Sequence, residues 1–171
     1  MDRVNISWCH GAFDTNVTTS TLADWLCKVG DTAASGDKKQ ADALMPHGHF
    51  VGRRAAGLQA HSGYVQIDID AKANPGLDPH ELRDLLGEDA HCGFSQLSFS
   101  MRGVWALFRV AGISAANHTA CADHVVAYVE DRYNVVCDAK VSRNLASLRF
   151  RSMDSDFIVN PTAQPFQFHD L

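Results

Sequence analysis

The sequence predicts an α+β domain, with a mixed or antiparallel sheet flanked by helices. Three observations indicate this class: segments with apolar residues at helical spacing, β-branched and aromatic runs between them, and two adjacent runs joined by a tight turn. The elements do not alternate as a doubly wound fold requires. With 171 residues, of which 46% are hydrophobic and 20% charged, the chain can bury one core. We therefore expect a single domain over residues 1–171.

The first 37 residues predict a helical lead-in. Thr19 to Asp31 has cap-type residues at its start, then Leu22, Trp25 and Leu26 at helical spacing, and Gly30 as the predicted stop of the helix. Residues 34–57 carry glycines, a proline and several basic side chains, which predicts a long functional loop.

The remaining elements follow in order along the chain. They are a strand over 64–70, a helix that begins after the N-cap Asp78 and ends at Gly87, a hairpin over 94–110, a helix capped by Ser114, and short apolar stretches at 135–138 and 147–150. The tail after residue 159 has the composition of a loop.

Composition and charge exclude several classes of protein. Five scattered cysteines without a C-x-x-C pair argue against a disulfide framework and against a thiolate zinc site. No segment approaches the roughly 18 apolar residues of a membrane span, and the N-terminus lacks the order of a secretory signal. We expect no membrane partner and a cytoplasmic location. Because the net charge is −5, phosphate binding requires local basic clusters.

The stretch YVQIDIDAK contains the most informative pair of residues. Since side chains alternate along a strand, Asp68 and Asp70 point to one face while Ile67 and Ile69 point to the other. Two adjacent carboxylates repel each other unless a cation neutralises them, and hard oxygen ligands favour Mg²⁺ or Mn²⁺. The alternative is that the strand ends here and both aspartates are solvated turn residues.

Two other stretches supply candidate phosphate ligands. The turn in SFSMRGVWALF carries Arg102 and could approach phosphates, although an ordinary hairpin turn is the alternative. Arg149 and Arg151 share a strand face and offer two guanidiniums suited to bidentate phosphate contacts. The alternative for this pair is a solvated outer face.

In this order, YVQIDID, SFSMRGVWALF and VVCDAKVSRNLASLRF resemble the three motifs of the archaeo-eukaryotic primase superfamily, the primase-polymerases. KKQADALMPHGHFVGRR and SRNLASLRFRSMDSDFIVNPTAQPF are similar to its VirE N-terminal-like branch. The resemblance covers residues 38–166 and implies a primase-polymerase (RRM-like) catalytic core there. Residues 1–37 precede this core.

The resemblance implies DNA-templated nucleotidyl transfer with two divalent ions, Mg²⁺ or Mn²⁺, in the replication of a phage, plasmid or other mobile element. It assigns metal binding and catalysis to Asp68, Asp70 and Asp138, with Asp154 as the second choice for the third carboxylate. The implied nucleotide contacts are Ser100, Arg102, Arg143 and Arg149, and the implied template contacts are Lys38, Lys39, Arg53 and Arg54. The partners would be primer and template DNA, nucleoside triphosphates and a helicase, in a bacterial or phage-infected cell.

One departure from the family pattern favours a second hypothesis. Trp105 stands where the family often has a histidine, and an indole can neither accept a metal nor replace the imidazole. The alternative function is therefore a catalytically degenerate accessory module that binds nucleic acid or a nucleotide. A third is a nuclease that uses the same carboxylates on water.

Two smaller groups of residues are interpreted as structural and not as catalytic or metal-binding. His47 and His49 lack the hydrophobic residue that the H-x-H of nicking enzymes has between its histidines, so we expect a solvated loop. Cys121 and His124 are three apart on a predicted helix without a second ligand pair, which indicates packing.

Overall fold

The computed structural model describes residues 4–27 and 37–167, which form two four-stranded sheets and a separate hairpin. The N-terminal sheet has the order β2 (Thr18–Thr21), β1 (Asn5–His10), β3 (Asp42–Met45) and β9 (Arg149–Phe150). The central sheet has the order β10 (Ile158–Val159), β7 (Cys92–Leu97), β8 (Gly103–Arg109) and β6 (Tyr64–Asp70). The hairpin pairs β4 (Gly48–Phe50) with β5 (Leu58–His61). All these strand pairs are antiparallel, as the predicted α+β class allows.

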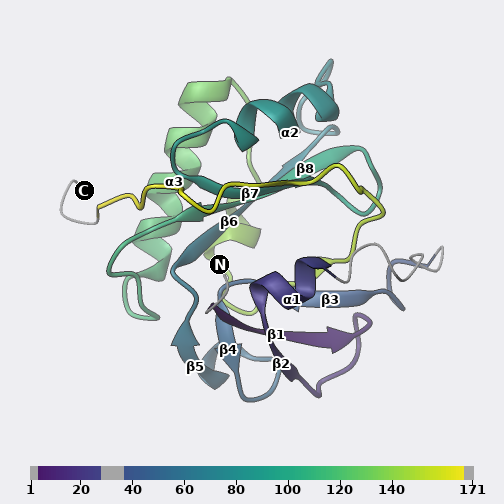
Figure 1. The fold of residues 1–171 in the computed structure, drawn as a ribbon, viewed down its shortest axis with the longest axis vertical. Coiled ribbons are helices and arrows are strands. Elements are labelled where there is room, and N and C mark those ends of the chain that lie inside the picture. Colours follow the sequence, from purple (N-terminus) through teal and green to yellow (C-terminus); the bar gives the residue numbers. More distant parts are fainter. Residues whose placement is uncertain (1–3, 28–36, 168–171) are drawn as a thin grey trace.

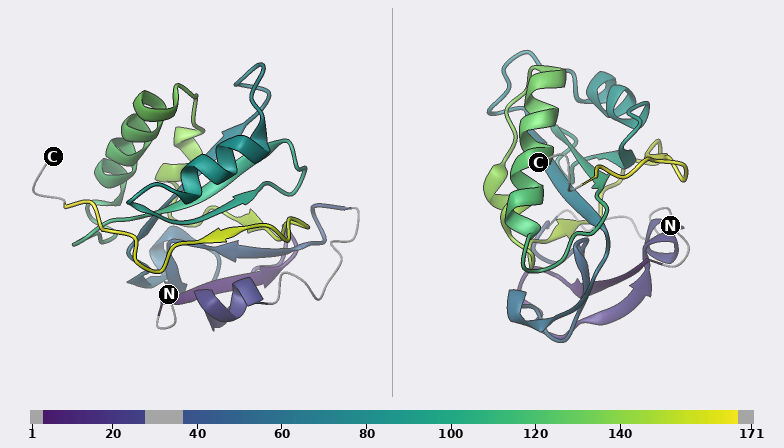
Figure 2. Two further views of the ribbon diagram at one scale, coloured as in Figure 1. Left: turned by 45° about the horizontal axis from the view of Figure 1, so that its top comes forward. Right: turned by 90° about the vertical axis from the view of Figure 1, so that its left-hand side faces the viewer.

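The helical elements are α1 (Leu22–Cys27), η2 (Ala55–Gly57), α2 (Pro79–Gly87), α3 (His118–Tyr133) and α4 (Ala139–Arg143). The helices α2 and α3 cover one face of the central sheet, whereas α1 packs against the N-terminal sheet. Figure 1 shows α2 and α3 above the central sheet and the N-terminal sheet below it, and Figure 2 shows the same layers from two other sides. The order β6-α2-β7-β8-α3-β10, with α4 and β9 inserted before β10, is the β-α-β-β-α-β order of split βαβ units.

The helix α2 begins where the sequence predicts. The Asp78 carboxylate accepts hydrogen bonds from the backbone N–H groups of His80, at 2.8 Å, and Glu81, at 3.3 Å. Pro79 occupies the first turn, where its missing N–H costs nothing. Leu82 and Leu86 are buried against the central sheet. The N-cap prediction is confirmed.

Alternation along β6 places its polar residues between the two sheets. Val65, Ile67 and Ile69 are fully buried in the core beneath α2 and α3. A second core, which includes Trp105 of β8 and Leu44 of β3, joins the central sheet to the N-terminal sheet. The opposite face of β6, with Gln66, Asp68 and Asp70, therefore points toward the N-terminal sheet at the edge of the central one.

The β7–β8 turn is confirmed as a tight hairpin. The backbone N–H of Ser98 donates to the carbonyl of Gly103 at 2.7 Å, and Met101 takes the left-handed conformation with φ of 58°. A Cβ at Gly103 would lie 2.4 Å from the carbonyl oxygen of Ile69, so the close approach of β6 requires glycine there.

Several predicted elements differ from the observed ones. The lead-in holds the strands β1 and β2 as well as α1, and the expected loop over 34–57 contains β3, β4 and η2 in its described part. These strands are three to six residues long, so periodicity alone could not separate them from loops, and pairing with distant segments defines them. The predicted helix stop at Gly30 lies outside the described residues. Ser114 lies before α3, whose N-cap position is Asn117.

None of the helices in the described ranges is long and apolar enough to cross a membrane.

Candidate functional site

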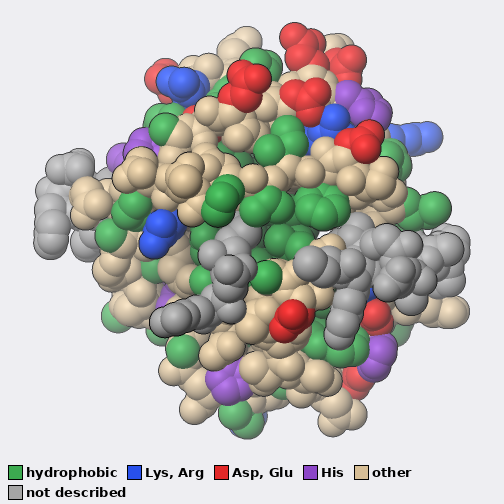
Figure 3. Space-filling view, viewed as in Figure 1, with side chains coloured by type: hydrophobic (Ala, Val, Ile, Leu, Met, Phe, Trp, Pro, Cys, Tyr) green, Lys and Arg blue, Asp and Glu red, His purple; other side chains and the backbone are tan. Residues whose placement is uncertain are grey.

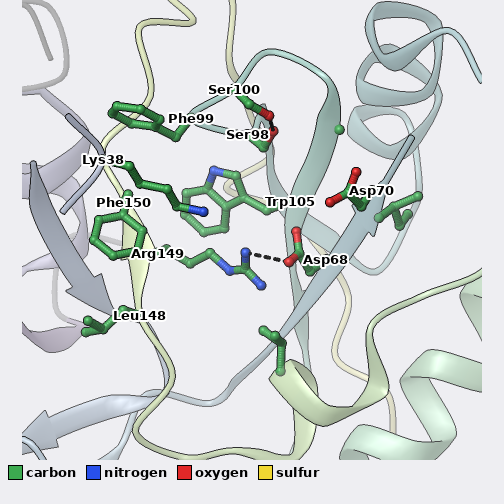
Figure 4. A pocket seen from close by; sticks show the side chains of 13 residues that line it. Lys38, Asp68, Asp70, Ser98, Phe99, Ser100, Trp105, Leu148, Arg149 and Phe150 are labelled. Atoms are coloured by element: carbon green, nitrogen blue, oxygen red, sulfur yellow. Dashed lines mark hydrogen bonds and ion pairs between the residues drawn. The ribbon is translucent and has the colours of Figure 1, made fainter. Parts of the chain in front are cut away.

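A cavity of about 180 Å³ opens between the two sheets and brings together residues that are far apart in the sequence. Its lining includes Asp68 and Asp70 of β6, Ser98 and Ser100 of the β7–β8 turn, Trp105 of β8 and Arg149 of β9. Figure 4 shows Asp68 and Asp70 on one side of this cavity and Lys38, Phe99 and Phe150 on the other. The cavity therefore has an acidic wall that faces an aromatic and basic wall.

Asp68 is neutralised by an arginine in this structure. Its Oδ2 atom lies 2.9 Å from Nη1 of Arg149, and the two side chains are 22% and 11% exposed. Asp70 is exposed, and its Oδ1 atom accepts a hydrogen bond from the backbone N–H of Lys72 at 3.1 Å. The carboxylate of Asp68 is thus paired with a guanidinium, whereas the carboxylate of Asp70 is open to solvent.

Arg149 is held on its other edge by Gln66. The Nε–H of Arg149 donates to Oε1 of Gln66 at 2.6 Å, and the Gln66 amide donates to the hydroxyl of Ser147 and, at 3.4 Å, to the carbonyl of Val141. Nη2 of Arg149 is buried and has no hydrogen-bond partner among the described residues. A buried donor without an acceptor costs about 1–3 kcal/mol. The guanidinium is therefore held in one orientation, but one of its nitrogen atoms lacks a hydrogen-bond acceptor.

Asp138 lies next to the site through its backbone. Its N–H donates to the carbonyl of Asp68 at 2.8 Å, while its exposed carboxylate caps α4 by accepting from the N–H groups of Lys140 and Val141. Asp138 is not among the residues that line the cavity. Within residues 4–27 and 37–167, no group of three or more His, Cys, Asp or Glu is arranged to hold a metal ion.

Asp154, the second choice for the third carboxylate, has a different setting. It is 3% exposed, pairs with Nη1 of Arg83 at 3.1 Å and accepts from the backbone N–H of Leu97 at 2.8 Å. These contacts join α2 and β7 to the segment after β9. The environment of Asp154 is that of a buried structural ion pair.

The predicted nucleotide contacts are divided between the cavity and the surface. The hydroxyls of Ser98 and Ser100 lie 3.2 Å apart beside the cavity. Arg102 is exposed at the tip of the turn and is not among the cavity residues. Arg143 is paired with Asp123 of α3, with 2.5 Å between Nε and Oδ1.

Trp105 is a packing residue that borders the cavity. It is 3% exposed, its ring lies 4.7 Å from that of Phe94, and its indole N–H donates to Oε1 of Gln96 at 3.2 Å. The register of β6 and β8 sets Trp105 opposite Asp68. Because the indole N–H already has an acceptor, Trp105 offers the cavity a wall rather than a ligand.

Of the four predicted basic residues, only Lys38 lines the cavity, and its Nζ lies 5.1 Å from the centre of the Phe150 ring. Lys39 lies over Phe13, Arg53 donates to the carbonyl of Ala12, and Arg54 is exposed.

Three histidines behind the site were not found from the sequence. His47, predicted to lie in a solvated loop, is fully buried, so that prediction is wrong. His47 Nε2 accepts from the backbone N–H of Gln66 at 3.3 Å, and Nδ1 lies 3.2 Å from the Leu145 carbonyl, which requires the Nδ1–H tautomer. His61 Nε2 lies 3.1 Å from Nδ1 of His118, whose Nε2 lies 2.9 Å from the Ser142 carbonyl.

These hydrogen bonds are the ones that three neutral imidazole rings would make. Nδ1 of His61 accepts from the N–H of Gly63 at 3.1 Å, so each ring nitrogen of the three histidines has a partner and none is left for a metal. Burial lowers the pKa of all three and takes that of His61 to about 4. The three histidines come from β5, α3 and the β3–β4 turn. Because these segments are far apart in the sequence, no local pattern predicts that the histidines meet.

The fold and the cavity thus define an α+β domain with a paired-carboxylate and arginine site. The family model described as BT4734-like, N-terminal domain matches residues 37–156, which is most of the chain, and the chain belongs to this family. A search of curated proteins gave no match.

Among solved structures, the chain is similar to the polymerase domain from Mycobacterium tuberculosis ligase D in complex with DNA, at 18% identity and a TM-score of 0.42. The similarity covers 85% of this chain and 57% of that one, so this chain spans little more than half of its length. A likeness of this size assigns no function to the present chain.

Proposed function

We propose that this domain is a metal-dependent nucleotidyltransferase of the primase-polymerase type, which extends a DNA primer along a template. One observation carries the proposal: Asp68, Asp70 and Arg149 line a single cavity, although Arg149 is about 80 residues from the aspartates. Carboxylates that bind cations beside a guanidinium that binds phosphate are the groups that nucleotidyl transfer needs.

The two aspartates suit a metal that arrives together with a triphosphate. Mg²⁺ keeps several waters and is bound through one or two carboxylates plus substrate phosphates, so Asp68 and Asp70 suffice as protein ligands. Asp138 would join them by giving up the cap of α4. The bound Mg²⁺ or Mn²⁺, two ions in the proposed mechanism, would stabilise the charge that develops on the phosphoryl oxygens.

The remaining side chains bind and orient the substrates. Arg149 and Lys38 bind the triphosphate, the hydroxyls of Ser98 and Ser100 donate to it, and the wall around Trp105 excludes water. The proposal includes primer and template DNA and nucleoside triphosphates as partners. It also includes a helicase and a role in the replication of a mobile element in a bacterial cytoplasm.

A second candidate function is the accessory module that binds nucleic acid or a nucleotide without catalysis. The ion pair between Asp68 and Arg149 favours it, because this carboxylate is neutralised by the protein itself. Such a domain would keep the arginine as an anion receptor and would not need the metal.

Primer extension separates these functions. The wild type, the Asp68→Asn/Asp70→Asn double variant and an Asp131→Asn control on the exposed face of α3 are assayed with Mn²⁺ or Mg²⁺ and each nucleotide set. Extension by the wild type and the control but not by the double variant supports the proposal. DNA or nucleotide binding without extension favours the accessory module, and primer shortening indicates a nuclease. Extension by a folded double variant refutes the assignment of the carboxylates.

A further inference from the structure

A second pocket, of about 380 Å³, opens beside the first residue of β6, whereas Asp68 and Asp70 lie at the end of that strand. It shares none of its described lining residues with the cavity of the two aspartates. Tyr64 and Asp68 are four residues apart, roughly 13 Å along an extended strand. This second pocket, called here the Tyr64 pocket, is therefore a separate candidate site, and it has the size of a small-molecule site.

The Tyr64 pocket lies between two connecting segments that hydrogen bonds hold in place. On one side, the turn before β6 is fixed to the end of β8, because the N–H of Val110 donates to the carbonyl of Gly63 at 2.9 Å. On the other side, the C-terminal segment (residues 160–167) is also fixed to β8, because the N–H of Phe166 donates to the carbonyl of Arg109 at 2.9 Å. The walls are thus preformed, which lowers the entropy cost of filling the pocket.

The hydroxyl of Tyr64 is a buried polar group that lacks a partner. Tyr64 is 6% exposed, lines the pocket, and packs its ring in the core between the two sheets. Among the described residues, no group forms a hydrogen bond with this hydroxyl. Burial raises the pKa of Tyr64, against the opposing effect of Arg109, so the phenol keeps its proton at neutral pH and can donate. Because an unpaired desolvated donor is costly, a ligand oxygen that accepts this proton would be stabilised.

Arg109 and Ser62 supply further donors to the same pocket. Arg109 lies directly opposite Tyr64 in the register of β6 and β8, and such residues point to the same face of an antiparallel sheet. Nη1 of Arg109 donates to the carbonyl of Ala163 at 3.2 Å, whereas Nε and Nη2 have no hydrogen-bond partner in the described part of the chain. The Ser62 hydroxyl accepts from the N–H of Tyr64 at 3.2 Å and can donate its own proton to a ligand. The pocket therefore offers one edge of a guanidinium and two hydroxyl donors.

The Tyr64 pocket combines a single positive charge with an apolar wall. Arg109 is the one charged side chain among its described lining residues, and Val4, Pro161 and Pro165 supply apolar surface. On the face shown in Figure 3, acidic side chains gather mainly over α2 and not along the C-terminal segment, which Figure 1 shows in yellow. A monoanion with an apolar body therefore fits the pocket better than a phosphate ester, whose charge at pH 7 is about −2.

We infer that the Tyr64 pocket binds a small organic monocarboxylate. The Nε–Nη2 edge of Arg109 donates two parallel hydrogen bonds to the carboxylate, which is the geometry that makes arginine a carboxylate receptor. The hydroxyls of Tyr64 and Ser62 donate to the same two oxygens, and the apolar body of the ligand packs against Pro161 and Pro165. Binding at this pocket is independent of the proposed nucleotidyl transfer, because the two sites share no described residue.

Binding of two carboxylates, benzoate and hexanoate, to the full chain tests this inference. Benzamide serves as the uncharged counterpart of benzoate, and inorganic phosphate serves as the dianion. Binding is followed in two-dimensional amide NMR spectra, in which the backbone amides of residues 62–64 and 109–111 should shift. Tyr64→Phe should weaken carboxylate binding on the order of tenfold, because it removes a donor to a charged acceptor and keeps the ring. Arg109→Gln should weaken it further, whereas the matched control Arg132→Gln, on α3 outside the pocket, should bind as the wild type does.

Each outcome either supports or overturns the assignment of the pocket. Saturable binding of benzoate or hexanoate that both pocket variants weaken supports it. Equal binding of benzoate and benzamide overturns it, as does tighter binding of phosphate, an unchanged affinity in Tyr64→Phe, or no saturable binding of either carboxylate. A thermal melt of Tyr64→Phe should match that of the wild type, because the hydroxyl that is removed has no partner within the described ranges. Loss of binding is thereby distinguished from loss of the fold.

Discussion

Replacing Arg149 by glutamine should tighten the binding of Mn²⁺ in the absence of nucleotide. Nη1 of Arg149 lies 2.9 Å from Oδ2 of Asp68, so the guanidinium competes directly with a cation for this carboxylate. The same change should weaken nucleotide binding, because a bidentate phosphate donor is lost. Opposite effects on the two ligands are a signature that a general loss of structure would not give.

The size of the effect follows from the geometry of the pair. Two unit charges about 4 Å apart interact by about 4 kcal/mol at an effective dielectric constant of about 20. Asp68 is 22% exposed and Arg149 11%, so solvent screens part of this interaction. We expect the dissociation constant of Mn²⁺ to fall on the order of tenfold, which corresponds to ~1.4 kcal/mol.

The assay is a titration with Mn²⁺ alone, followed by the electron paramagnetic resonance signal of the free ion. Nucleotide binding is measured separately by equilibrium dialysis in the presence of a chelator. Arg132→Gln serves as the control, because Arg132 forms an arginine–aspartate pair with Asp89 outside the cavity, at 3.3 Å. Unchanged or weaker Mn²⁺ binding by a folded Arg149→Gln variant would refute the view that this arginine occupies the metal site.

Two further predictions concern stability. Asp154→Asn removes one of the two carboxylates that pair with the buried Arg83, which keeps Asp84 at 2.7 Å, and should cost about 1–3 kcal/mol in urea unfolding; a loss of primer extension at unchanged stability would instead place Asp154 among the metal ligands. Because the pKa values of His47, His61 and His118 are lowered, the unfolded chain binds more protons than the folded one below pH ~6.5. Stability should be complete above that pH and fall toward pH 4, by up to about 1.4 kcal/mol per pH unit for each histidine. A flat profile of urea midpoints between neutral pH and pH ~5 would contradict this.

The elements that the sequence predicted best carry strong local signals. The helix α2 is bounded by the Asp78 cap and by Gly87, and the β7–β8 turn holds Met101 and Gly103. Caps and tight turns depend on a few neighbouring residues, so they are visible in sequence. The strands β3 and β4 have no such signal, because each is four residues or fewer and exists through pairing with distant segments.

The candidate site, like the fold, was predictable from the sequence only where a local pattern defines it. Alternation along β6 was enough to place Asp68 and Asp70 on one face, and the order of the motifs was enough to associate them with Arg149. Sequence could not show that Arg149 binds Asp68 itself, that Gln66 orients it, or that Asp138 caps α4. Each of these contacts depends on how two sheets pack, which no local pattern encodes.

By itself, the sequence determined the α+β class, the polar face of β6 and the residue types available for chemistry. These follow from periodicity and from capping, which act over a few residues. Only the tertiary structure decided which side chains meet, including the histidines behind the site and Phe13 beside Lys39. Such contacts form between segments that are tens of residues apart, and their free energy depends on burial and charge in the packed molecule.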